Sequence, residues 1–253
     1  MTSSQLHKTK SKSVKALLQI NMRAQDFITA TVQYHDTLSP VAWHNETLRT
    51  EVRDKLIEIA QIFVSYLEIP NFEILDIVLA GSMTNYNWTE FSDFDLHVVT
   101  RYSDLQCDDL AEAFYRAKKT IWNNEHDINI GEHEVELYVE DVENAPVSGG
   151  IYSIFKNEWL EKPAYEKPSV DSNSVTSKVH DLTVQIDKAI EDSNNPEDLK
   201  RITDKLRKMR RNGLDTHGEF GVENLTFKVL RNMGYIERLH DAYLHKQDQQ
   251  LSM

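Results

Sequence analysis

The sequence predicts an α/β (α+β) fold, with a mixed sheet core, N-terminal helices and a C-terminal helical domain. Two observations support this prediction. Apolar residues recur at helical spacing near both ends of the chain. Between about 72 and 155 the pattern changes to short apolar runs and to alternation of apolar and polar residues, which is typical of strands. The middle of the chain is therefore expected to form the sheet.

The elements of the core follow from these patterns in chain order. Val14 opens a helical stripe that runs to about Asp36, and Pro40 suits the first position of a second helix that ends near Leu67. The apolar run 72–80 predicts a buried strand. The remaining expected elements are a strand at 93–100, a helix at 108–123, a hairpin at 127–130 and 134–140, and a strand or loop at 147–155.

A composition change marks the boundary of the C-terminal domain. Pro163 and Pro168, followed by a Ser/Asn-rich stretch, predict a linker. We therefore expect a flexible N-terminus at 1–13, a core with leading helices at 14–168, and a helical domain at 169–253.

Three helices are expected in that last domain. A stripe of apolar residues predicts the first at 175–190. Asn195 is a suitable cap for the second, which we expect to end at Gly213. The third is expected from about Val222 to His245.

Charge and cysteine content narrow the possible functions. With 28 basic and 41 acidic side chains, the net charge is -13, so generic DNA binding is not expected. Cys107 is the only cysteine, which excludes an internal disulfide and favours a reducing, cytoplasmic location and an ordinary neutral thiol. No apolar run is long enough for a membrane span, and the N-terminus lacks the apolar core of a signal peptide.

Three acidic residues and one Gly-Ser pair form the most informative pattern. Gly81-Ser82 follows the apolar strand, where glycine permits close approach of a phosphate and serine offers a hydroxyl. Asp93 and Asp95 alternate with apolar residues on the next strand, so both point to one face. Glu136 has apolar neighbours on a later strand and is expected to approach the same place.

These carboxylates predict a metal-dependent phosphoryl-transfer site. Carboxylate oxygens suit Mg²⁺, with Mn²⁺ as a substitute, and two ions could be held by Asp93, Asp95 and Glu136. In such a site one ion accompanies the triphosphate and the other lowers the pKa of the attacking hydroxyl.

The order of these motifs resembles the DNA polymerase beta-type nucleotidyltransferase superfamily, over about Phe72 to Asp141. The resemblance implies a nucleotidyltransferase-type mixed sheet, triphosphate binding by Gly81 and Ser82, and magnesium binding by the three acids. The segments 148–153 and 218–228 are also similar to uncharacterised, often phage-encoded, predicted nucleotidyltransferases. If the chain is phage-encoded, the expected location is the host cytoplasm.

Several residues near the pattern allow two interpretations. Glu134 lies on the same strand face as Glu136 and could replace it, although the apolar neighbours of Glu136 favour the latter. His97 could touch substrate or simply pack. The aromatic residues of the loop could stack a base or cover the core; they are Tyr86, Trp88 and Phe91.

Two further candidates lie in the helical domain. The basic cluster 205–211 could contact triphosphate or a structured RNA such as tRNA, or it could be a solvated helix face. Related folds close a helical domain over the core and contribute a phosphate-binding base, for which Lys228 is the candidate, with Asn224 one turn before it. The active site is then expected between the core and the helices.

The predicted activity is transfer of an NMP from an NTP, with release of pyrophosphate, to an RNA end, a protein or a small molecule. Three alternatives remain: a cyclic or linear oligonucleotide synthase, a sugar-nucleotide transferase, and a catalytically silent nucleotide-binding module that acts on a host factor. Products formed from NTPs alone would indicate the synthase, and binding of a UDP-sugar in preference to an NTP would indicate the sugar-nucleotide transferase. Unchanged cellular function in Asp93→Asn/Asp95→Asn would indicate the silent module.

Overall fold

A computed structural model describes residues 24–105, 108–144, 146, 148–165 and 167–252. The predicted flexible segment 1–13 and Cys107 lie outside the described residues. The described residues fall into two compact units. One, the α/β unit, runs from Tyr34 to Tyr165; the other, the helical unit, combines 24–33 with the chain from Lys167 onward.

The secondary structure agrees with the predicted order of elements in most of the core. The α/β unit contains, in order, β1 (Trp43–His44), β2 (Thr47–Leu48), α3 (Thr50–Leu67), β3 (Asp76–Ala80), the short 3-10 helix η1 (Ser82–Thr84), β4 (Phe94–Thr100), η2 (Tyr102–Leu105), α4 (Asp108–Glu125), β5 (Asn129–Ile130), β6 (His133–Asp141), β7 (Ile151–Ser153) and β8 (Glu158–Glu161). The helical unit contains α2 (Ala24–Thr31), α5 (Ser172–Asp192), α6 (Pro196–His217), α7 (Val222–Asn232) and α8 (Tyr235–Leu251).

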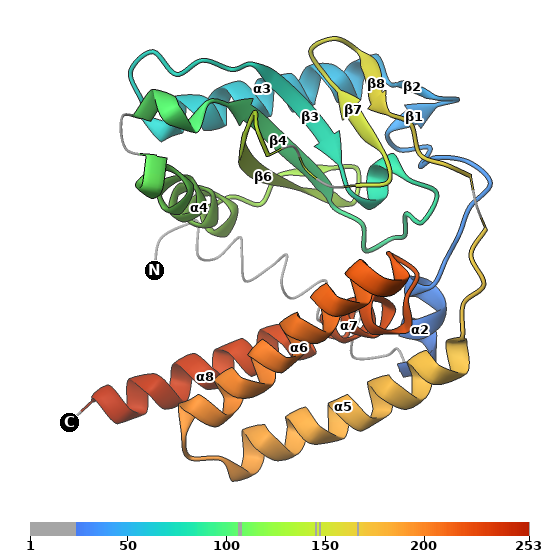
Figure 1. The fold of residues 1–253 in the computed structure, drawn as a ribbon, viewed down its shortest axis with the longest axis vertical. Helices are drawn as coiled ribbons and strands as arrows, with labels where there is room; N and C mark the ends of the chain where they lie inside the picture. Colours follow the sequence, from blue (N-terminus) through green and yellow to red (C-terminus); the bar gives the residue numbers. More distant parts are fainter. Residues whose placement is uncertain (1–23, 106–107, 145, 147, 166, 253) are drawn as a thin grey trace. The chain divides into compact units, whose positions relative to one another are not determined.

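A six-stranded mixed sheet is the centre of the α/β unit among the described residues, which confirms the predicted fold class. Its strand order is β5-β6-β4-β3-β7-β8. The strands β6, β4, β3 and β7 are labelled in Figure 1. The pair β4–β6 is parallel and its neighbours in the sheet are antiparallel. Parallel neighbours need a crossover connection, and α4 supplies it between β4 and β6.

One face of this sheet is apolar and packs against helices. Phe63 and Leu56 of α3 are fully buried in the same core cluster as Leu96 and Leu137 of the central strands. Helix α3 runs across this face (Figure 1), and α4 adds Trp122 to the cluster. The alternate residues of β4 and β6 therefore point to the opposite face.

Side chains, rather than a long neighbouring strand, satisfy the outer edge of β6. Strand β5 pairs with β6 only at His133 and Glu134. Further along, the Asn123 side chain donates to the Leu137 carbonyl at 3.1 Å and accepts from the Leu137 N–H at 3.0 Å. The Tyr102 hydroxyl donates to the Val139 carbonyl at 2.7 Å. These contacts protect an edge that would otherwise offer unpaired backbone groups.

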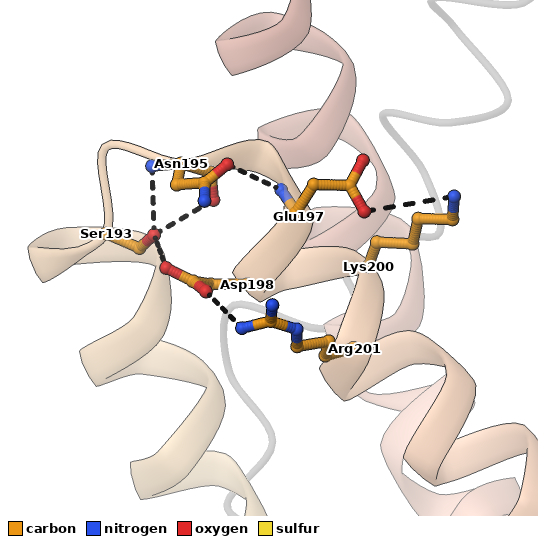
Figure 2. Close-up of polar contacts among 6 residues, drawn as sticks. All are labelled: Ser193, Asn195, Glu197, Asp198, Lys200 and Arg201. Carbon is orange, nitrogen blue, oxygen red and sulfur yellow. Dashed lines mark hydrogen bonds and ion pairs between the residues drawn. The ribbon is translucent and has the colours of Figure 1, made fainter.

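The turn between α5 and α6 shows why the second helix begins at Pro196. The Asn195 side chain accepts a hydrogen bond from the Glu197 N–H at 3.1 Å, and Ser193 Oγ lies 3.0 Å from Asp198 Oδ2 (Figure 2). A capped N-terminus with acidic residues in the first turn is favoured by the helix dipole. The prediction of a cap at Asn195 is thus confirmed.

Two predicted helix ends in this unit were wrong. Helix α6 continues through Gly213 to His217. A Cβ at Gly213 would lie 2.4 Å from Glu223 Cβ, so this glycine permits close contact between α6 and α7 instead of ending a helix. The expected helix 222–245 is two helices, because Gly234 adopts a left-handed conformation (φ 78) between α7 and α8.

Two differences concern the N-terminal part. Pro40 does not open a helix: the short hairpin β1–β2 follows it, and the helix begins at Thr50. Helix α2, expected among the leading helices of the core, belongs to the helical unit. The Asn232 amide donates to Thr31 Oγ1 at 2.8 Å, which ties α2 to α7.

We expect Leu56→Ala to lower the free energy of unfolding of the α/β unit by about 2–5 kcal/mol, because it leaves a cavity in a fully buried site. Ile62→Ala, on the same helix but 53% exposed, should change it by about 0.5 kcal/mol or less. All four tryptophans lie in the α/β unit, so urea unfolding followed by tryptophan fluorescence measures this unit. Equal losses would contradict the assigned core.

Candidate active site

Asp93 and Asp95 lie at the start of β4, where acidic and buried apolar residues alternate. Phe94 and Leu96 are fully buried in the core. Asp93, before Phe94, and Asp95, between Phe94 and Leu96, are partly exposed. Asp95 therefore projects from the sheet face opposite α3, and Asp93 lies one residue before the strand begins. The alternation read from the sequence is the physical reason for this placement.

The parallel pairing of β4 with β6 brings Glu136 beside Asp95. Asp95 and Glu136 are direct register partners, and so are the buried leucines that follow them, Leu96 and Leu137. Parallel neighbouring strands lie about 4.8 Å apart, so both carboxylates leave the same face at adjacent positions. Glu134 lies one residue before the first registered pair, Phe94 and Val135.

Gly81 occupies a turn that contacts Asp95 directly. Ala80, its predecessor, pairs with Asp95 in the antiparallel β3–β4 ladder. Gly81 has φ 82 and ψ -158, a conformation available essentially to glycine alone. A Cβ there would lie 2.0 Å from Asp95 Oδ2. The absence of a side chain at 81 is therefore a requirement of the Asp95 position.

The polar groups of this turn form hydrogen bonds with two neighbouring segments. The Gly81 N–H donates to Ser148 Oγ at 3.1 Å. The Ser82 hydroxyl donates to Ser92 Oγ at 2.8 Å, and His133 Nδ1 lies 2.7 Å from the Ser92 carbonyl oxygen. The Gly-Ser pair identified from the sequence is thus held close to the start of β4.

A second glycine segment packs against the same turn. Thr84 of η1 donates through its hydroxyl to the Gly150 carbonyl at 2.7 Å, and a Cβ at Gly150 would lie 2.1 Å from the Thr84 carbonyl oxygen. The run Ser148-Gly149-Gly150 was the available signal for a tight backbone contact, but it does not name the partner.

Tyr138 and Lys119 are neighbours of the carboxylates that sequence reasoning missed. The Tyr138 hydroxyl donates to Glu136 Oε2 at 2.6 Å. Burial, and then the charges of Glu136 and Asp95, raise the pKa of Tyr138 well above its ordinary value, so its hydroxyl stays a donor. Lys119 Nζ lies 3.6 Å from the centre of the Tyr138 ring. The alternation of buried and partly exposed residues in β6 places Tyr138 on the same face as Glu136, so the sequence held a signal for it. Lys119 lies on α4, and no local pattern indicates that it approaches this face.

The ammonium group of Lys119 interacts with several nearby carboxylates. Burial lowers the pKa of Lys119, while the charges of Glu136, Asp95 and Glu140 act in the opposite direction. Asp93 also contributes to the raised pKa of Tyr138. The charges of Asp93, Asp95 and Glu136 therefore all act on the Tyr138 phenol, and Lys119 of α4 lies close enough to interact with Asp95 and Glu136.

His97 and two of the loop aromatics have packing partners within the α/β unit. His97 stacks on Tyr138, with ring centres 4.7 Å apart, and its Nδ1 lies 3.1 Å from Glu140 Oε1. Trp88 stacks on His35 with ring centres 3.8 Å apart. Tyr86 is buried and packs against Tyr34 and Tyr165. These contacts favour the packing interpretation for Tyr86 and Trp88.

The remaining candidates lie in the helical unit. Asn224 is 1% exposed, and its amide donates to the Glu219 carbonyl at 2.7 Å, so it stabilises the loop before α7. Lys228 is partly exposed one turn later on α7. In the basic cluster, Arg210 lies over the Phe227 ring and Lys205 contacts Gln185, so part of this cluster has partners within its own unit.

The donor chemistry of the site fits a divalent cation. Asp95 and Glu136 supply hard carboxylate oxygens from adjacent strands. Mg²⁺ is commonly bound by one or two carboxylates together with substrate phosphates, rather than by a protein cage. Within the ranges that the structure describes, no group of three or more His, Cys, Asp or Glu side chains is arranged to hold a metal ion. The registered pair, not a closed cluster, is thus the feature suited to such a cation.

Comparison with known proteins adds little to this geometry. No protein-family model and no curated protein matches the chain. One similar solved structure is the Elizabethkingia meningoseptica CdnE cyclic dinucleotide synthase with GTP and Apcpp; it is 14% identical, covers 84% of this chain and 82% of its own, and has a TM-score of 0.25.

A second is the STING-associated CdnE c-di-GMP synthase from Capnocytophaga granulosa, 13% identical, covering 97% of this chain and 93% of its own, with a TM-score of 0.20. Likeness at these TM-scores carries no argument about this chain. Separately, none of the described helices is both long enough and apolar enough to span a membrane.

We expect Gly81→Ala to destabilise the α/β unit by about 3 kcal/mol or more, because it adds backbone strain and displaces Asp95. Gly131→Ala is the matched control: its φ is also positive (63), but its Cβ would meet only Val41 Cγ1 at 3.4 Å. That variant should cost about 1–2 kcal/mol. Urea unfolding by tryptophan fluorescence measures both, and equal costs would contradict the combined strain and crowding at Gly81.

Proposed function

We propose that this chain is a metal-dependent nucleotidyltransferase that transfers an NMP from an NTP to a hydroxyl-bearing acceptor and releases pyrophosphate. The observation that carries the proposal is the contact of the Gly81-Ser82 turn with Asp95, whose register partner on the parallel strand is Glu136. This chemistry requires backbone N–H and hydroxyl groups for phosphate beside paired carboxylates for the cation, and both are found at this end of β4.

Each residue of the site has a proposed role. The turn at Gly81 and Ser82 would bind the triphosphate through its backbone N–H and hydroxyl groups, which would exchange their present partners Ser148 and Ser92 for phosphate oxygens. Asp93, Asp95 and Glu136 would bind two Mg²⁺ ions together with the phosphates of the NTP, since among the described residues the side chains alone form no three-residue metal site; Mn²⁺ could substitute. When bound, these ions supply charge neutralisation at the phosphates and a lower pKa of the acceptor hydroxyl.

The proposed preference for Glu136 over Glu134 rests on register. Glu136 is opposite Asp95, whereas Glu134 lies before the first pair of the β4–β6 ladder. Glu136 also accepts the Tyr138 hydrogen bond, which fixes one of its oxygens. The roles of Lys228 and Asn224 in NTP binding stay predictions from the family resemblance; in the helical unit Asn224 is 1% exposed and its amide donates to the Glu219 carbonyl.

The proposed acceptor is an RNA end, a protein or a small molecule. The net charge of -13 disfavours long generic nucleic acid, but the exposed Arg207, Lys208 and Arg211 leave a structured RNA such as tRNA compatible with the helical unit. A synthase that joins nucleotides to each other would use the same residues.

We expect NTPs with Mg²⁺ to raise the Tm of the wild-type protein by about 5–10 °C at 100 times their Kd, by mass action. Asp95→Asn and Glu136→Gln should abolish this rise, because each removes a charged ligand. Differential scanning fluorimetry with each NTP, with Mg²⁺ or with EDTA, makes the measurement.

Glu134→Gln is the matched control on the same strand face and should keep the NTP response. Loss of the response in Glu134→Gln but not in Glu136→Gln would reassign the third acid. No Mg²⁺-dependent response to any NTP in the wild-type protein would contradict the proposed function. Asp95→Asn without ligand should be at least as stable as wild type, because one of several like charges is removed.

Incubation with α-labelled NTPs distinguishes the reactions. We expect pyrophosphate release together with label transfer to an added acceptor, and neither in Asp95→Asn. Labelled cyclic or linear products from NTPs alone would instead identify an oligonucleotide synthase, and consumption of a UDP-sugar would identify a sugar-nucleotide transferase. Chromatography of the labelled products gives the answer.

A further inference from the structure

Tyr138 is joined to the proposed metal-binding carboxylate by one short hydrogen bond. It follows Glu136 by two residues on β6, so both side chains leave the same face of the sheet. Its hydroxyl donates to Glu136 Oε2 at 2.6 Å. This bond engages one of the two carboxylate oxygens of Glu136 and defines the rotation of that group.

The ring of Tyr138 is itself fixed by side chains from two other elements. His97 of β4, its register partner, stacks on it at an interplanar angle of 17°. His97 is in turn held by Glu140, at 3.1 Å from its Nδ1. Lys119 of α4 places its ammonium 3.6 Å from the ring centre. A ring held in this way can direct its hydroxyl to one position only.

We propose that Tyr138 is a positioning residue for the cation site: it holds Oε2 of Glu136 so that Oε1 is presented toward Asp95 and a bound divalent cation. This inference rests on the proposed function. Tyr138 would affect cation binding indirectly, by orienting Glu136. Groups that hydrogen-bond a metal-binding carboxylate commonly change metal affinity by about 10- to 100-fold when removed. Tyr138 itself does not touch the reacting atoms.

A purely structural role is the competing interpretation, because Tyr138 also packs within the sheet. Tyr102 offers a matched comparison. Its hydroxyl donates to the Val139 carbonyl at 2.7 Å, so it supports the same strand without contacting a carboxylate that faces Asp95. Replacing either tyrosine by phenylalanine removes one hydroxyl and keeps the ring.

The test measures Mn²⁺ binding to the full-length, EDTA-stripped protein by electron paramagnetic resonance titration of free Mn²⁺. We expect Tyr138→Phe to weaken Mn²⁺ binding by about 10- to 100-fold. Tyr102→Phe should bind Mn²⁺ as wild type does. The unfolding midpoint of each variant in EDTA, followed by tryptophan fluorescence, shows that the protein is folded in every titration.

The outcomes separate this inference from the function on which it rests. Mn²⁺ binding that needs Asp95 and Glu136 but is the same in Tyr138→Phe and wild type would overturn the positioning role and leave the function standing. Equal weakening in Tyr138→Phe and Tyr102→Phe would also overturn it, since a general effect on β6 would explain both. No Mn²⁺ binding by the wild-type protein, with or without NTP, would overturn both proposals.

Discussion

The parallel pairing of β4 with β6 is the constraint on which the rest of the candidate site depends. It sets Asp95 opposite Glu136 and, on the other face, Leu96 opposite Leu137. A slip of one residue would turn the buried leucines outward and the carboxylates inward, at a large cost in apolar burial and desolvation. The hydrophobic core beneath the sheet therefore determines where the acids meet above it.

Close backbone approach is the second element of the site. Gly81 lies against Asp95, and Gly150 lies against the Thr84 carbonyl, so two chain segments meet where any Cβ would collide. Gly213 serves a related purpose in the helical unit, where it lets α7 pack onto α6. Gly234 differs, because it is needed for its left-handed conformation between two helices. Glycine is therefore required at these positions for different physical reasons, which the sequence alone does not distinguish.

The electrostatics of the site explain its other neighbours. Carboxylates on one face repel one another, which makes the face receptive to cations. Lys119 contributes a cation and the Tyr138 hydroxyl contributes a hydrogen-bond donor near these carboxylates. Both come from positions that would look unremarkable without the strand pairing.

The sequence by itself determined the mixed α/β class, the alternation that places Asp95 on the face opposite the buried Phe94 and Leu96, and the helix cap at Asn195. These follow from periodicity and capping, which act over a few residues. Only the tertiary structure decided that Glu136 pairs with Asp95, that Ser148 contacts the Gly81 turn, and that Tyr138 and Lys119 join the carboxylates. The helix through Gly213 and the break at Gly234 were also decided there. The reason is that strand register and helix contacts depend on burial between residues far apart in the chain, which local patterns do not encode.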